Sequence, residues 1–82
     1  MIKVLFFASL KETLDCESFE VTDASIDTVA KLRELLAQKG EAWATAIGAS
    51  NTLVAVNQAM SDDQKALKSG DEVAFFPPVT GG

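Results

Sequence analysis

The 82-residue sequence predicts an α+β fold in which one main helix packs across one face of a mixed sheet. The first and last predicted strands are apolar on both parities, which is typical of strands in the middle of a sheet. One segment between them carries an apolar stripe of helical period. With 48% hydrophobic residues, the chain is long enough for one small core and too short for two. We therefore expect one domain over 1–76, followed by an extended, flexible tail over 77–82.

The N-terminal segment predicts two strands. Residues 2–8 are rich in β-branched and aromatic side chains and predict the first strand, with Leu5 and Phe7 on its less covered face. Its core-facing residues are Ile2, Val4 and Phe6. Residues 9–14 are interpreted as a connecting turn or a short helix. Apolar and polar residues alternate over 17–21, which predicts a second strand in which Phe19 and Val21 point inward.

The main helix follows a break at residues 23–25. Either Asp27 or Thr28 can cap it, because both side chains can accept a hydrogen bond from the free N–H groups of the first turn. Its apolar stripe consists of Val29, Leu32, Leu35 and Leu36. Arg33 belongs to the opposite, solvated side in this interpretation. The helix is expected to end near 39–40, where a cation and then a glycine are favourable.

The C-terminal half predicts a second short helix and three more strands. The helix spans 41–47, and its Trp43 is expected to pack over the core. The strands are predicted at 53–56, at 59–60 after a turn at 57–58, and at 72–76 after a tight turn at 69–71.

A second set of apolar residues is expected on the sheet face that carries no helix. If Val73 and Phe75 face the helix, Phe76 faces outward beside Phe7. Met60 on the short strand is expected to join them. An exposed patch with two phenylalanines and a methionine indicates a partner interface. The alternative is that the loop over 48–52 folds across this patch.

The sequence holds little ordinary catalytic equipment. Without histidine and with a single cysteine, the usual pairing of a nucleophile with a base cannot be assembled. Phosphate-binding glycine motifs and Cys/His metal clusters are also missing from the sequence. The adjacent carboxylates at 62–63 and 71–72 lie in predicted turns, where we expect them to be solvated.

The net charge and the cysteine content limit which partners and which cellular compartment are expected. A formal charge of −5 disfavours nucleic acid, which requires a basic surface. Cys16 is expected to be a small, partly buried apolar residue, and a single thiol is compatible with a reducing compartment. No run approaches the ~20 apolar residues of a membrane span. We therefore expect a cytoplasmic protein that binds neither nucleic acid nor membranes.

The C-terminus carries the one group that remains for chemistry. Pro77 and Pro78 stop the last strand and keep the chain extended, and Gly81 and Gly82 bear no side chains. Such a tail is thin enough to enter a channel in another protein. The α-carboxylate of Gly82 becomes reactive once a partner converts it to an acyl-adenylate, and a sulfur nucleophile would then leave a thiocarboxylate. An ordinary frayed terminus is the alternative interpretation.

Three segments resemble the small, sulfur-carrying subunits of molybdopterin synthase, the ubiquitin-like MoaD family. They are MIKVLFFA at 1–8, AVNQ at 55–58 and GDEVAFFPPVTGG at 70–82, and the last is the most specific. The resemblance covers the whole chain and implies a ubiquitin-like β-grasp fold. It also implies that the chain is not catalytic alone but is the sulfur-donating subunit of a heteromeric sulfurtransferase.

The resemblance further implies a set of partners. An adenylyltransferase of the ubiquitin-activating type would use ATP to adenylate the terminal glycine, and a persulfide donor would supply sulfur. The chain itself would bind no cofactor and no metal. The large subunit would receive the tail in a heterotetramer, where sulfur passes to cyclic pyranopterin monophosphate to build the molybdopterin dithiolene.

The resemblance also implies roles for individual residues. Gly82 would be the sulfur-bearing terminus and Gly81 the spacer before it. The expected partner-binding residues are Phe7, Lys11, Met60, Phe76, Pro77, Pro78, Val79 and Thr80. Lys11 stands where the family often has arginine, which keeps the charge but not a bidentate contact.

Other functions stay open at this point. A thiamine-pathway sulfur carrier would share the chemistry but is usually shorter and ends in a different segment before the diglycine. A ubiquitin-like modifier would use the same terminus to form isopeptide bonds. A plain β-grasp binding module would function with Gly82 deleted.

Overall fold

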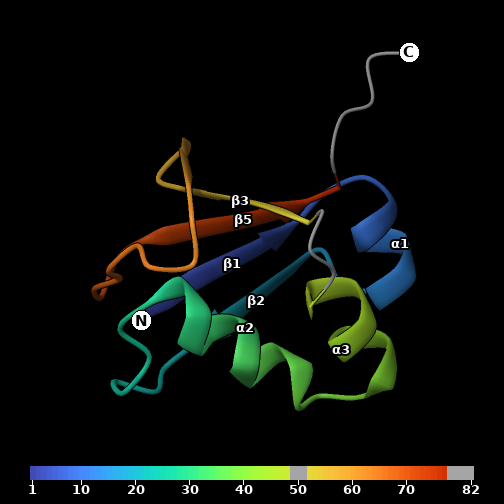
Figure 1. The fold of residues 1–82 in the computed structure, drawn as a ribbon, viewed down its shortest axis with the longest axis horizontal. Coiled ribbons are helices and arrows are strands. Elements are labelled where there is room, and N and C mark those ends of the chain that lie inside the picture. The colour runs from blue at the N-terminus through green and yellow to red at the C-terminus, as the bar shows by residue number, and fades with distance from the viewer. Residues whose placement is uncertain (49–51, 78–82) are drawn as a thin grey trace.

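The computed structural model describes residues 1–48 and 52–77, which form a five-stranded mixed sheet with helices against one face (Figure 1). The strands are β1 (Ile2–Phe6), β2 (Ser18–Val21), β3 (Leu53–Val56), β4 (Ala59–Ser61) and β5 (Glu72–Phe76). The helices are α1 (Ser9–Leu14), α2 (Val29–Ala37) and α3 (Glu41–Gly48). The predicted fold class is confirmed, with two shorter helices beside the predicted main one.

The first and last strands of the chain lie side by side in the sheet. The strand order is β2-β1-β5-β3-β4, with β1 and β5 parallel and the other pairs antiparallel. Val4 is level with Val73 and Phe6 with Phe75, and the two phenylalanine rings stack with their centroids 6.2 Å apart. The apolar character of β1 and β5 on both parities is explained by this position between other strands.

The helix side of the sheet holds the core. The predicted inward residues Ile2, Val4 and Phe6 are all buried. Leu32 and Leu36 of α2 are fully buried, whereas Leu35 is half-buried at the margin of the stripe. Trp43 of α3 packs edge-on against Phe6, at 5.4 Å between ring centroids, so its predicted packing role is confirmed.

The cap of α2 is Thr28, one of the two predicted candidates. The Thr28 hydroxyl accepts a hydrogen bond from the Lys31 N–H at 3.2 Å. The other candidate, Asp27, forms an exposed ion pair with the Lys31 ammonium at 3.0 Å instead. Position i to i+4 pairs of this kind add only a few tenths of a kcal/mol to a helix (~0.3–0.5).

Two predicted boundaries differ from the structure by more than one residue. β1 ends at Phe6 rather than Ala8, because Ala8 has a φ of 54° and the Leu10 N–H bonds back to the Phe7 carbonyl in a turn that starts α1. α2 ends at Ala37 rather than near 39–40. The Lys39 ammonium lies 4.1 Å from the centroid of the Phe19 ring, so this cation contacts an aromatic ring on β2.

Candidate functional site: the open face of the sheet

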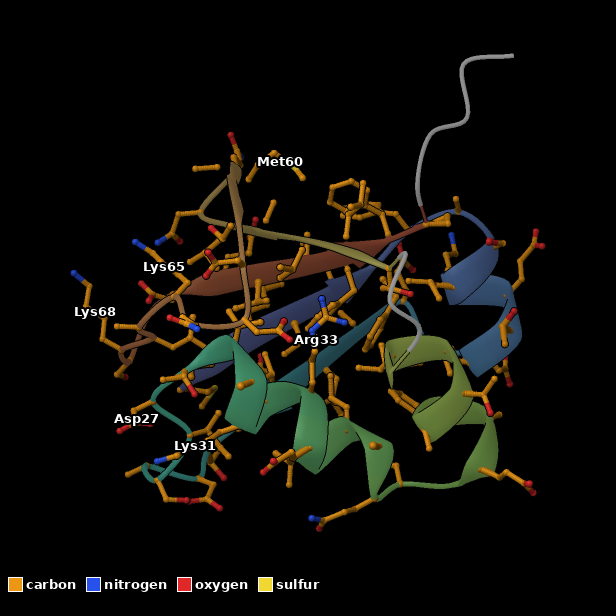
Figure 2. The ribbon with its side chains drawn as sticks, in the orientation of Figure 1. Asp27, Lys31, Arg33, Met60, Lys65 and Lys68 are labelled. Carbon is orange, nitrogen blue, oxygen red and sulfur yellow. The ribbon has the colours of Figure 1, made fainter. Side chains whose placement is uncertain are left out.

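One face of the sheet carries apolar side chains that no described helix covers. We call it the open face, and its apolar residues are Leu5, Phe7, Leu53, Ala55, Met60, Ala74 and Phe76. Phe7 is 48% and Met60 63% exposed, far more than other large apolar residues of the sheet. Figure 2 shows Met60 projecting on the side of the sheet away from α2. Exposure of large apolar side chains at one place is typical of interaction surfaces.

Strand register explains how these residues come together. Leu53 pairs with Phe76, and Ala55 lies between Met60 and Ala74 in one row across three strands. Alternate residues of a strand point to opposite faces, so all of these point away from the helices. Ala55 and Ala74 have small side chains, and the larger side chains of Met60, Leu53 and Phe76 lie next to them.

The open face changes character along the strands. At the end where β5 begins, Lys3 is level with Glu20 on one side and Glu72 on the other. At the end where β5 finishes, Leu53 and Phe76 pair instead. The apolar part therefore lies at the end of the sheet from which the chain continues towards its C-terminus.

Of the predicted binding residues, Phe76 and Pro77 lie at this end, whereas Met60 is level with Ala55 and Ala74 in the middle of the sheet. Phe7, one residue beyond β1, continues the pairing with β5 because its N–H donates to the Phe75 carbonyl at 3.2 Å. Strand alternation therefore places Phe7 on the same surface as Phe76 and Met60. Pro77 is half-buried directly after β5, and Lys11 is exposed on α1, a helix that contacts β5. Their role in binding stays a prediction. The other predicted site residues, Pro78, Val79, Thr80, Gly81 and Gly82, lie outside the described residues.

The loop over 48–52, the alternative cover for the open face, is described only at Gly48 and Thr52. Residues 49–51 lie outside the described part. Thr52 is buried, and its hydroxyl donates to the Ala46 carbonyl of α3 at 2.7 Å. The described end of the loop is therefore bonded on the helix side of the sheet.

Asp71 was expected to be solvated, and this expectation is wrong. It is only 6% exposed, and its carboxylate accepts hydrogen bonds from the Lys68 N–H at 2.9 Å and the Asn57 side-chain amide at 3.1 Å. The hydrogen bond from the Lys68 N–H, followed by that from Asn57, lowers the pKa of Asp71 below its usual value. Asn57 also accepts from the Glu72 N–H at 3.0 Å. Asp71 thus joins the β3–β4 turn to the start of β5.

Arg33 was also expected to be solvated, and its side chain is instead only 17% exposed. Its guanidinium donates to Asp63 and to two backbone carbonyls, Ile47 and Thr52. Local sequence gives no signal of this, because all three acceptors are distant along the chain.

Cys16 behaves as predicted. It is half-buried, packs against the core, and lies within 3.2 Å of the Ser18 carbonyl, to which its thiol donates. Within residues 1–48 and 52–77, His, Cys, Asp and Glu side chains form no group of three that could hold a metal ion. In the same ranges, every helix is too short or too polar to cross a membrane.

Comparison with known proteins places the chain in a family. Residues 4–82 match the ThiS family. The sequence is 48% identical to the molybdopterin synthase sulfur carrier subunit of Escherichia coli and 46% identical to that of Haemophilus influenzae, in both cases over 100% of each chain.

Solved structures also include chains with a similar fold. The fold is similar to SAMP1 from Haloferax volcanii, with a TM-score of 0.80 and 25% identity over 99% of this chain and 98% of that one. It is also similar to a chain in the protein-protein complex of subunits 1 and 2 of molybdopterin-converting factor from Helicobacter pylori. There the TM-score is 0.70 and the identity 30%, over 99% of this chain and 97% of that one. The predicted β-grasp fold and carrier-subunit family are confirmed: the chain belongs to the ThiS family and, within it, to the molybdopterin synthase sulfur carrier subunits.

Proposed function

We propose that this chain carries sulfur as a thiocarboxylate on Gly82 and delivers it to the large subunit of molybdopterin synthase. The observation that carries the proposal is the open face, whose exposed Phe7 and Met60 lie on the same surface as Phe76 at the end of the last strand. A diglycine terminus follows that strand in the sequence. A docking surface and a reactive terminus are thereby joined by only a few residues.

The charging step uses the terminal carboxylate and no other group of the chain. An adenylyltransferase of the ubiquitin-activating type joins the Gly82 carboxylate to AMP and releases pyrophosphate from ATP. A persulfide donor then attacks the acyl carbon and displaces AMP, and a second thiol cleaves the resulting acyl disulfide. The donor leaves as a disulfide, and Gly82 keeps one sulfur as the thiocarboxylate.

The delivery step follows docking. The tail enters the large subunit, and its sulfur bonds to a side-chain carbon of cyclic pyranopterin monophosphate and displaces the oxygen substituent of that carbon. Water then cleaves the acyl–sulfur bond, which leaves the sulfur on the pterin and restores the Gly82 carboxylate. Each of the two sulfurs of the dithiolene comes from one carrier, and the assembly is a large-subunit dimer with one carrier at each end. In this cycle the chain binds no cofactor, and ATP is consumed by the activating enzyme. The proposed cycle takes place in the cytoplasm.

Binding energy for delivery comes from the open face. Ordering a tail costs about 1–2 kcal/mol for each residue that is fixed. Burying apolar surface contributes roughly 25 cal/mol per Å², so a partner that covers the open face can offset this cost. Pro77 restricts the unbound chain and reduces the cost further.

The test measures charging and delivery separately. The intact mass of the chain is recorded after incubation with the activating enzyme, ATP and a persulfide donor, and we expect a gain equal to one oxygen replaced by sulfur, located at Gly82. Dithiolene formation is then measured with the large subunit. Deleting Gly82, or substituting Gly81→Val, is expected to abolish dithiolene formation while large-subunit binding is retained.

A matched glycine substitution controls for general effects. A Cβ added at Gly48 would meet no heavy atom within 4 Å, so Gly48→Ala is expected to support dithiolene formation like the wild type. Dithiolene formation by the chain without Gly82 would overturn the proposal.

A ubiquitin-like modifier is the second candidate, and the likeness to SAMP1, a small archaeal modifier protein, favours it. In that case the activated terminus would be attacked by a lysine amine. A mass shift on a second protein, joined to Gly82 by an isopeptide bond, would distinguish this outcome from sulfur transfer.

A further inference from the structure

Arg33 connects three segments that are far apart in the sequence. Its Nε donates to Asp63 Oδ1 at 2.6 Å, its Nη1 to the Ile47 carbonyl at 2.6 Å and its Nη2 to the Thr52 carbonyl at 3.1 Å. Asp63 follows β4, Ile47 lies in the last turn of α3, and Thr52 directly precedes β3. Figure 2 shows the Arg33 side chain reaching from α2 towards the sheet.

The guanidinium group lies on the helix side of the sheet, opposite the Leu53–Phe76 pair of the open face. Its central carbon is 5.2 Å from the centroid of the fully buried Phe75 ring. Phe75 precedes Phe76, and Thr52 precedes Leu53, which pairs with Phe76 across β3 and β5. Arg33 therefore contacts the residues next to both members of this pair, from the opposite side of the sheet.

Stability alone does not explain a cation at this place. The Arg33 side chain is 17% exposed and has lost much of its contact with water, whereas its partner Asp63 is 56% exposed, and an ion pair with an exposed carboxylate adds little to stability. Arginine differs from an apolar residue, and from lysine, in its planar fork of donors, which fixes the direction of each acceptor. The distinctive contribution of Arg33 is thus the placement of two backbone carbonyls.

We propose that Arg33 is a positioning residue for large-subunit binding: it sets the start of β3 and the end of β5 so that Leu53 and Phe76 present one surface to the partner. This inference rests on the proposed function, because it concerns the same docking surface. Arg33 itself lies on the helix side of the sheet and touches the partner only through the strands that it holds.

The test compares binding with stability in two variants. Arg33→Met removes the donors, and Arg33→Lys keeps the charge but cannot bond the three acceptors at once. Affinity for the large subunit is measured by calorimetry at a temperature where circular dichroism shows each variant to be fully folded. We expect both variants to bind about tenfold more weakly or worse, since misplacement of groups by about 1 Å is enough for losses of this size.

Two further variants separate position from stability. Thr52→Val keeps the shape of a buried residue but loses its bond to the Ala46 carbonyl, and we expect it to weaken binding in the same direction by a smaller factor. Leu67→Ala, or the milder Ile26→Val where the former does not fold, lowers stability in the core beside the start of α2. The fully folded control is expected to bind like the wild type.

The outcomes are distinct. Wild-type affinity in folded Arg33→Met and Arg33→Lys would overturn the positioning role. Wild-type affinity in Arg33→Lys alone would also overturn it, because the positive charge would then be sufficient without the planar set of guanidinium donors. Failure of the wild-type chain to bind the large subunit would contradict the proposed function instead.

Discussion

The two faces of the sheet are built from alternate residues of the same strands, yet their side chains differ in how far they are buried. On the helix side, Val4, Phe6, Val73 and Phe75 are at most 1% exposed. On the open face, Phe7 is 48% exposed and Phe76 half-buried. A side chain such as Phe75 contributes about 1.5–3 kcal/mol to folding when it is fully buried. Phe76, its neighbour on the open face, is only half-buried. The apolar surface that it still exposes can be buried against a partner.

This difference shows how a small domain combines a core with a docking surface. A chain of this size has few strands, and each must serve both purposes. Alternation in β1 and β5 allows this, because the pleat assigns successive residues to opposite faces.

The sharpest test of the comparison exchanges neighbouring phenylalanines for alanine. Phe75→Ala is expected to lower the free energy of unfolding by about 3–5 kcal/mol, because it leaves a cavity in the core. That is a large part of the ~5–15 kcal/mol of a typical domain. Phe76→Ala is expected to cost about 1 kcal/mol or less, as is usual for surface substitutions. Urea unfolding measures both, and equal losses would contradict the division into two faces.

The next test asks whether the open face binds the large subunit. Phe76→Asp is expected to weaken association by roughly 2 kcal/mol or more, because the complex would bury an unpaired carboxylate. Charging of Gly82 at saturating activating enzyme is expected to continue. Glu72→Gln, on the same face at its charged end, serves as a control with little effect. Affinity unchanged by Phe76→Asp would remove the open face from the docking surface.

The smallest expected effect concerns the polar end of the sheet and its pH dependence. The hydrogen bond from the Lys68 N–H, and then that from Asn57, holds the pKa of Asp71 below its ordinary value of 3.8. A lowered folded-state pKa means that the stabilisation is present above about pH 4 and is lost as the pH falls through the lowered pKa. Asp71→Asn is expected to cost about 1 kcal/mol at neutral pH.

Urea unfolding at a series of pH values measures this dependence. The difference in stability between the wild type and Asp71→Asn should shrink as the pH falls below about 4. A difference that stays constant or grows would show that the carboxylate charge is not what stabilises this end of the sheet. Affinity for the large subunit at neutral pH is expected to be unchanged, because Asp71 lies at the other end of β5 from Phe76.

Most of the fold, and the apolar character of the open face, can be predicted from the sequence. The two parities of residues 2–6 and 72–76 predict central strands with two apolar faces, and the position of Met60 on a short strand predicts its place on the open face. These features could be predicted because they depend on the period of a strand or helix, which is a local property of the backbone. The terminal sequence FFPPVTGG likewise indicates the family.

The roles of Arg33 and Asp71 become visible only in the folded chain. Both are charged residues at positions where sequence patterns predict contact with water. Their acceptors and donors come from distant segments: Arg33 bonds Thr52 and Asp71 bonds Asn57. Whether a charge is solvated or held in a network depends on which backbone groups the folded chain brings within hydrogen-bonding distance, and that is a property of the assembled sheet and helices rather than of any local segment.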